Sequence, residues 1–189
     1  MKTILLAGAL FLFACGTNTK QEGKNESPEV QSGLSAKKLT WQAPQGWVTE
    51  TPTSSMRMAQ YSLPRVDGDP EDASVAVFYF HGQGGSVEAN LQRWYGQFVQ
   101  PDGRSSQVAA EVSKSTVNDL QQTTVDISGT YLFRLTPMAP TSTEKPHFRM
   151  LAAVVESSMG PYFVKMVGPE KTIKNWQQSF FEFMKTFKE

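Results

Sequence analysis

The stretch Ala73–Phe80, with the sequence ASVAVFYF, decides the fold. In an extended strand its alternate positions from Val75 to Tyr79 face one side, and those from Ala76 to Phe80 face the other. Both sets are apolar, which is typical of a strand in the middle of a sheet that is covered on both faces. The stretch therefore predicts a layered fold with helices on both sides of a sheet.

Other segments show strand periodicity on either side of this stretch. They are 56–63, 108–117, 123–133, 148–156 and 162–167. Asn118-Asp119 and Ser157–Pro161 have turn chemistry, and each separates two of these segments. The sequence therefore predicts two antiparallel hairpins, and a long proline-rich loop over Leu135–Pro146.

Two segments have helical periodicity instead. Ser86 can cap the first, whose apolar positions form one stripe with Gln92 outside it. Pro169 stands where the second helix tolerates a first-turn proline. The stripes consist of Val87, Leu91, Trp94 and Phe98, and of Ile173, Trp176, Phe180, Phe183 and Phe187. We interpret both as core, so the fold class is α+β: a mostly antiparallel sheet flanked by helices, or α/β/α sandwich.

The beginning of the chain has the pattern of a bacterial lipoprotein signal. Lys2 precedes a short apolar run, and Leu12-Phe13-Ala14-Cys15 resembles a lipobox that ends in the only cysteine of the chain. The run is too short to cross a hydrocarbon core of roughly 30 Å, so it is interpreted as a cleaved signal. The resemblance implies cleavage after residue 14 and a diacylglycerol thioether on Cys15. The alternative is a buried cysteine in an ordinary signal peptide or a short core helix.

The chain then divides into a tether and one domain. Residues 15–38 are polar and poor in large apolar side chains, so the segment after the lipidated cysteine is predicted to be a flexible tether. Residues 39–189 are predicted to form a single globular domain. We expect a membrane partner through the lipid anchor. Because Gly16 is not aspartate, the periplasmic face of the outer membrane is favoured if the cell is Gram-negative.

The amino-acid composition excludes some classes of function. The chain has 18 basic and 18 acidic side chains among 189 residues, so no basic excess is available to hold a nucleic acid. With its one thiol consumed by lipid, the domain can form no disulfide and must be stabilised by core burial. No cofactor is predicted.

The segment Trp41–Trp47 (WQAPQGW) resembles the opening of PsbP-like domains. The order of predicted elements is also similar to theirs: antiparallel strands, a helix after the early strands, a late hairpin and a closing amphipathic helix. The resemblance covers residues 39–189. It implies an α/β/α sandwich that serves binding or assembly, without indicating a reaction or a ligand.

One glycine-rich loop is a candidate site. Gly82, Gln83, Gly84, Gly85 and Ser86 join the central strand to the start of the first helix. Backbone N–H groups and the helix dipole can hold an anion there, although the loop matches neither a Walker A nor a dinucleotide motif. The alternative is a tight crossover in which glycines permit positive φ and close packing.

The sequence offers few other candidates for a metal-binding or catalytic site. The acidic stretch Asp67–Asp72 lacks the ligand spacing of an EF-hand, so we interpret it as a solvated turn, and no metal site is predicted. His81 and His147 lie far apart in the sequence, although the two could meet in space with Asp126 or Glu156 as a base or metal pair. Without a nucleophile motif, no catalytic residue is predicted and the protein is expected not to be an enzyme.

The sequence therefore predicts a lipoprotein that binds a protein or envelope partner. The alternative is a domain that binds a small ligand or anion through the Gly82–Ser86 loop. A partner-binding protein should expose an extended apolar patch. A ligand-binding protein should have a concave pocket lined by aromatic side chains and a few converging polar groups.

Overall fold

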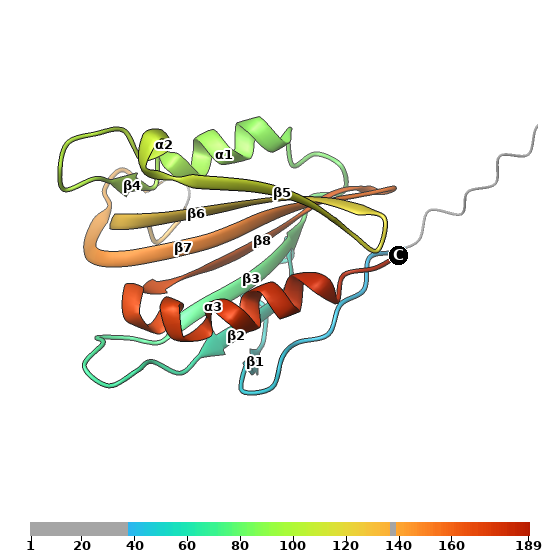
Figure 1. The fold of residues 1–189 in the computed structure, drawn as a ribbon, viewed down its shortest axis with the longest axis horizontal. Helices are drawn as coiled ribbons and strands as arrows, with labels where there is room; N and C mark the ends of the chain where they lie inside the picture. The colour runs from blue at the N-terminus through green and yellow to red at the C-terminus, as the bar shows by residue number, and fades with distance from the viewer. Residues whose placement is uncertain (1–37, 137–138) are drawn as a thin grey trace, which may run out of the picture. The chain divides into compact units, whose positions relative to one another are not determined.

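An antiparallel sheet of eight strands forms the centre of the computed structural model, which describes residues 38–136 and 139–189 (Figure 1). The strand order is β1-β2-β3-β8-β7-β6-β4, and β5 pairs with the first half of β6. The strands are β1 (Val48–Glu50), β2 (Arg57–Leu63), β3 (Ala73–Tyr79), β4 (Phe98–Val99), β5 (Glu111–Val117), β6 (Leu120–Phe133), β7 (Thr143–Ser157) and β8 (Gly160–Pro169). The helices are α1 (Val87–Tyr95), α2 (Ser106–Ala109) and α3 (Glu170–Lys185). None of the helices in the described ranges is long and apolar enough to cross a membrane.

The helix α3 covers one face of the sheet (red in Figure 1). Its buried side chains Ile173, Phe180 and Phe183 form one core cluster with Val75 and Val77 of β3. These residues have no measurable exposure, so this face of the central strands is closed. The burial of such large side chains contributes about 1.5 to 3 kcal/mol each.

The helix α1 covers part of the opposite face. Leu91 and Trp94 form a second core cluster with Val125, Ile127 and Met150 of β6 and β7. The cover is incomplete, because α1 has only nine residues and contacts chiefly the β6 side of the sheet. Helices on both faces confirm the predicted α+β sandwich, and the open part of the α1 face provides room for a pocket.

The two predicted hairpin turns are present. Asn118 and Asp119 both have positive φ, 50° and 65°, as a two-residue turn between β5 and β6 requires. Ser157 pairs with Gly160 at the end of the β7–β8 hairpin. Trp94 is buried and Gln92 is exposed, as the helical stripe predicts.

Some element boundaries differ from the sequence prediction. Residues 106–109 form the short helix α2, capped by Ser105, so β5 begins at Glu111. The helix α1 ends at Tyr95, before Gly96, and Phe98 belongs to β4. Phe98 nevertheless stays in the predicted cluster, because β4 leads back along the same face.

The largest correction concerns the predicted loop 135–146. Its last residues, from Thr143, extend β7 by pairing with the end of β6. The register shifts between Gly129 and Tyr131, where Pro146 and His147 lie opposite Thr130. His147 has a φ of 58°, which fits an irregular strand rather than a regular one.

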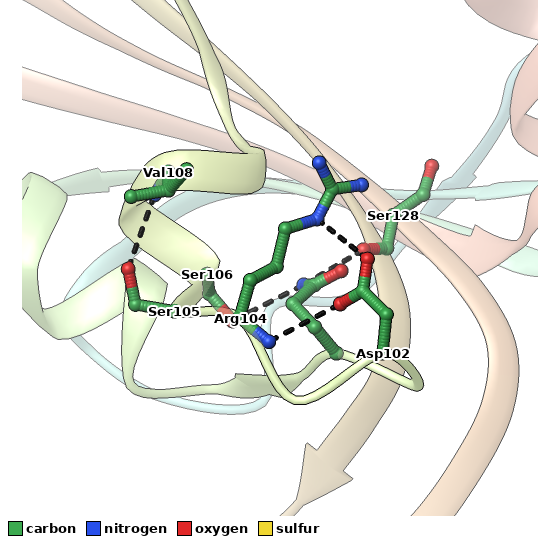
Figure 2. A network of polar contacts seen from close by, with 7 residues as sticks. Asp102, Arg104, Ser105, Ser106, Val108 and Ser128 are labelled. Atoms are coloured by element: carbon green, nitrogen blue, oxygen red, sulfur yellow. Dashed lines mark hydrogen bonds and ion pairs between the residues drawn. The ribbon is translucent and has the colours of Figure 1, made fainter.

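A polar network holds the segment after β4 to β6 (Figure 2). The buried Gln100 amide donates to Ser106 Oγ at 3.1 Å and to the Ser128 carbonyl at 3.0 Å. Ser106 in turn donates to the Phe98 carbonyl at 2.8 Å. A Cβ on Gly129 would lie 2.9 Å from the Val99 carbonyl, so this approach needs glycine. The network satisfies buried polar groups and is therefore structural.

Candidate functional site

The predicted anion loop Gly82–Ser86 is a tightly built crossover. Gly82 and Gly85 have positive φ, 78° and 81°, whereas Gly84 is needed for space: a Cβ there would lie 2.3 Å from the Phe163 ring. The carbonyls of Gly84 and Ser86 both accept from the Asn90 amide at 2.9 Å. This geometry fits the packing interpretation.

The last residue of this loop, Ser86, also caps the N-terminus of α1. Ser86 Oγ accepts from the Ala89 N–H at 3.2 Å, and the Gln83 N–H donates to the Phe80 carbonyl at 2.8 Å. The five loop residues line neither of the two pockets described below. Anion binding by Gly82–Ser86 stays a prediction.

A pocket of about 630 Å³ lies beside α1, on the part of the sheet that α1 leaves open. Its floor consists of side chains from β3 and β8: Ala76, Phe78, Lys165 and Val167. The pairing of β3 with β8 places these side chains together on the pocket floor. Ala76 and Lys165 are directly paired and therefore face the same side of the sheet.

The walls come from distant parts of the chain. Arg93 and Gln97, from α1 and the turn after it, form one side. The far end of the β6–β7 hairpin forms the other, with Tyr131, Phe133 and Phe148. We call this space the Lys165 pocket. It joins aromatic walls to a few polar groups, as ligand pockets generally do.

Lys165 is the unusual residue of this pocket. Its Nζ donates to Gln97 Oε1 at 2.6 Å and to the Tyr131 hydroxyl at 3.1 Å, and lies 5.1 Å from the centre of the Tyr131 ring. Among the described residues, no carboxylate forms an ion pair with it. Burial lowers the pKa of Lys165 to about 8, with the charge of Arg57 as a second cause.

Other cations surround the same space. Arg57 lies over the Phe78 ring at 5.4 Å and donates to Gln60. Lys145 lies near the Phe133 and Phe148 rings and forms an ion pair with Glu71 at 2.5 Å. In all, the lining includes five cations, Arg57, Arg93, Arg134, Lys145 and Lys165, against two carboxylates, Glu71 and Asp72. The pocket therefore attracts anions although the whole chain is neutral.

The acidic stretch 67–72 has structural partners, which corrects its interpretation as a merely solvated turn. Asp69 Oδ2 accepts from the Thr172 N–H at 2.9 Å and from its hydroxyl at 2.6 Å, at the start of α3. Asp72 accepts from the Arg65 N–H at 3.0 Å. Within the described ranges, no group of three or more His, Cys, Asp or Glu side chains is placed to hold a metal ion.

The structure does not bring the two histidines together in either pocket. His147 lines a second pocket of about 500 Å³ with Asp69 and Lys171, next to the Lys165 pocket, whereas His81 lines neither. Asp126, one of the carboxylates considered with them, forms an ion pair with Arg149. Glu156 is exposed. Cys15 lies outside the described residues.

The Lys165 pocket was not predicted from the sequence, although the sequence holds one signal for it. Residues 162–167 read YFVKMV, so Lys165 is the single charged side chain in an apolar strand of the central sheet. A lysine at such a position must be paired, desolvated or functional. The residues of the pocket walls show no comparable pattern in the sequence, because they come from elements that lie far apart along the chain.

The chain matches no family model, and it matches no curated protein in sequence. Among solved structures it is similar to PA94, a Pseudomonas aeruginosa protein of unknown function, with a TM-score of 0.48 and 8% identity over 74% of this chain and 94% of that chain.

It is also similar to the cyanobacterial PsbP protein CyanoP of Synechocystis sp. PCC 6803. That TM-score is 0.43, with 10% identity over 83% of this chain and 94% of that chain. Values this low carry no inference about function, and the fold class rests on the strand order and register described above.

Proposed function

We propose that this domain binds a small anionic ligand with an apolar body in the Lys165 pocket. The observation that carries the proposal is a desolvated lysine that faces a pocket without a carboxylate partner. Lys165 is half-buried, and a desolvated charge without a counter-charge is costly, so sequences rarely retain one without a use. An anionic group on a ligand would supply the missing charge.

The aromatic walls support an apolar body on the same ligand. Phe78 and Tyr131 are partly buried in the pocket, and Phe133 on its rim is 37% exposed. Ligand pockets usually combine such apolar surface with a few polar groups that fix the orientation. The proposal thus favours the ligand-binding alternative of the sequence analysis, at a different site from the Gly82–Ser86 loop.

The other parts of the proposal come from the sequence. Lipidation at Cys15 and a tether over residues 15–38 would hold the binding domain at a membrane of the cell envelope. We propose binding rather than catalysis as the role of the domain. An envelope protein partner stays a prediction.

A pair of fluorescent probes tests the ligand class. 8-Anilino-1-naphthalenesulfonate has an aromatic body and a sulfonate, and N-phenyl-1-naphthylamine has the same body without the charge. We expect the sulfonate to bind the folded protein at one saturable site, and Lys165→Met to weaken it at least tenfold. The neutral probe should bind equally well to both proteins.

The matched control is Lys174→Met. Lys174 is exposed on α3, on the other side of the sheet, so its removal changes the net charge equally without touching the pocket. Equal sulfonate affinity in Lys165→Met and Lys174→Met would contradict the proposal.

A further inference from the structure

The surroundings of the Lys165 amine suit a reaction as well as a charge interaction. Gln97 Oε1 can only accept a hydrogen bond, whereas the Tyr131 hydroxyl can donate or accept one. Both partners are uncharged, so the neutral amine is satisfied here as fully as the ammonium. The neutral amine carries a lone pair, and it opens onto a pocket large enough for a small molecule.

We infer that Lys165 captures ligands covalently, by forming an imine with the aldehyde of an anionic aromatic compound. This inference rests on the proposed function, because it uses the same pocket. The Nζ lone pair attacks the carbonyl carbon, and a C–N bond forms as the C–O π pair moves to oxygen. The nitrogen then loses two protons, the oxygen leaves as water, and a C=N bond remains.

The groups around Lys165 favour this step. Burial, and after it the charge of Arg57 on β2, lowers the pKa of Lys165 to about 8. At pH 7 this raises the neutral fraction by about two orders of magnitude over an ordinary lysine. Burial raises the pKa of Tyr131, so its hydroxyl keeps its proton and can deliver it to the departing oxygen.

The other cations of the pocket have a different role. Lys145 forms an ion pair with Glu71, and Arg93 donates to Asn90 Oδ1 at 2.7 Å. They can hold the anionic group of the ligand while Lys165 reacts. Lys165 can thus attract the anionic ligand in its charged form and react in its neutral form, while Arg93 and Lys145 hold the anionic group.

Pyridoxal 5′-phosphate is the probe, because it combines an aldehyde, an aromatic ring and a phosphate. We expect it to form an imine with the full chain, and borohydride reduction followed by peptide mass spectrometry should find the adduct on Lys165. Labelling of Lys165 should exceed that of Lys174 at least tenfold, and its rate should rise with pH about a midpoint near 8. Lys165→Met should remove the adduct.

Two controls separate this inference from the proposed function. Pyridoxine 5′-phosphate has an alcohol in place of the aldehyde, so it should displace the naphthalenesulfonate probe without forming an adduct. Tyr131→Phe keeps the aromatic wall and removes the hydroxyl, so it should slow imine formation by a larger factor than it weakens binding of that probe. Pocket binding of the sulfonate probe with adducts spread evenly over exposed lysines, or with none, would refute covalent capture and leave the proposed function intact.

Discussion

Lys165 occupies a position where its strand otherwise places apolar side chains, between Phe163 and Val167 on the same face of β8. It is retained there although its ammonium is poorly solvated, and neither neighbour compensates its charge. The residue therefore works against stability, which is common for groups that serve a function.

This conflict predicts a stabilising substitution. Because the folded pKa of about 8 lies below the unfolded value of 10.5, the native lysine costs stability at neutral pH, and the cost disappears as the pH rises from about 8 to 10.5. Lys165→Met should raise the free energy of unfolding by about 1 to 3 kcal/mol at pH 7. Denaturant titrations of both proteins should show the gain shrinking towards pH 10.5. A loss of stability at pH 7 would contradict this account.

Position 84 requires glycine because there is no space for a side chain, and not because of its backbone φ. Gly84→Ala forces the new Cβ against the Phe163 ring, and we expect a loss of about 1 to 3 kcal/mol. Gly68→Ala is the control, since Gly68 has a φ of 87° with nothing within 4 Å of the added Cβ, and should cost about 1 kcal/mol. Adding Phe163→Leu should recover part of the Gly84→Ala loss in chemical denaturation. No recovery would mean that the ring is not the obstacle.

At the scale of elements, periodicity identified the helices and most strands because their burial is local and regular. The start of β7 was not identified by periodicity. The segment Thr143–Pro146 is polar, contains a proline and extends the strand only through pairing with β6. Such pairing depends on residues far away in the sequence, so a local pattern cannot show it. The short strand β1 has all three residues exposed and likewise lacks an alternating pattern.

The start of α3 depends on a side chain from another element. Pro169 offers no side-chain cap, and Asp69 in the β2–β3 loop supplies it through Thr172. Asp69→Ala should therefore lower the free energy of unfolding by about 1 to 2 kcal/mol. Asp67→Ala is the control in the same loop, because Asp67 is exposed and should cost less than about 0.5 kcal/mol. Equal melting temperatures for the two variants would exclude this capping role.

At the scale of the whole molecule, the fold class was predictable and the Lys165 pocket was not. Two apolar faces on Ala73–Phe80 require two covering layers. The pocket instead exists because α1 is short and because residues at the end of β6 and the start of β7 line the space beyond it. Both facts are properties of the assembled domain.

The proposed anchor leads to a prediction at this scale. Cys15→Ala should abolish labelling by a fatty-acid probe and move the protein from the membrane fraction to the soluble fraction, since the thioether needs the cysteine sulfur. Binding of the naphthalenesulfonate probe should be unchanged, because the pocket lies within residues 57–167. Thr17→Ala should keep the label. Equal labelling of Cys15→Ala and the parent protein would overturn lipidation.

The ends of the domain are adjacent (Figure 1): the Thr40 N–H donates to the Lys188 carbonyl at 2.8 Å, and the Lys188 N–H donates to the Thr40 carbonyl at 3.0 Å. A short linker from residue 189 to residue 39 would therefore close the chain at little entropic cost. New ends could then be opened in the exposed turn 52–55, and this circular permutant should keep its circular dichroism spectrum and its probe binding. The connectivity of the chain is thus separable from the architecture, and the order in which the elements are synthesised is not what holds them together.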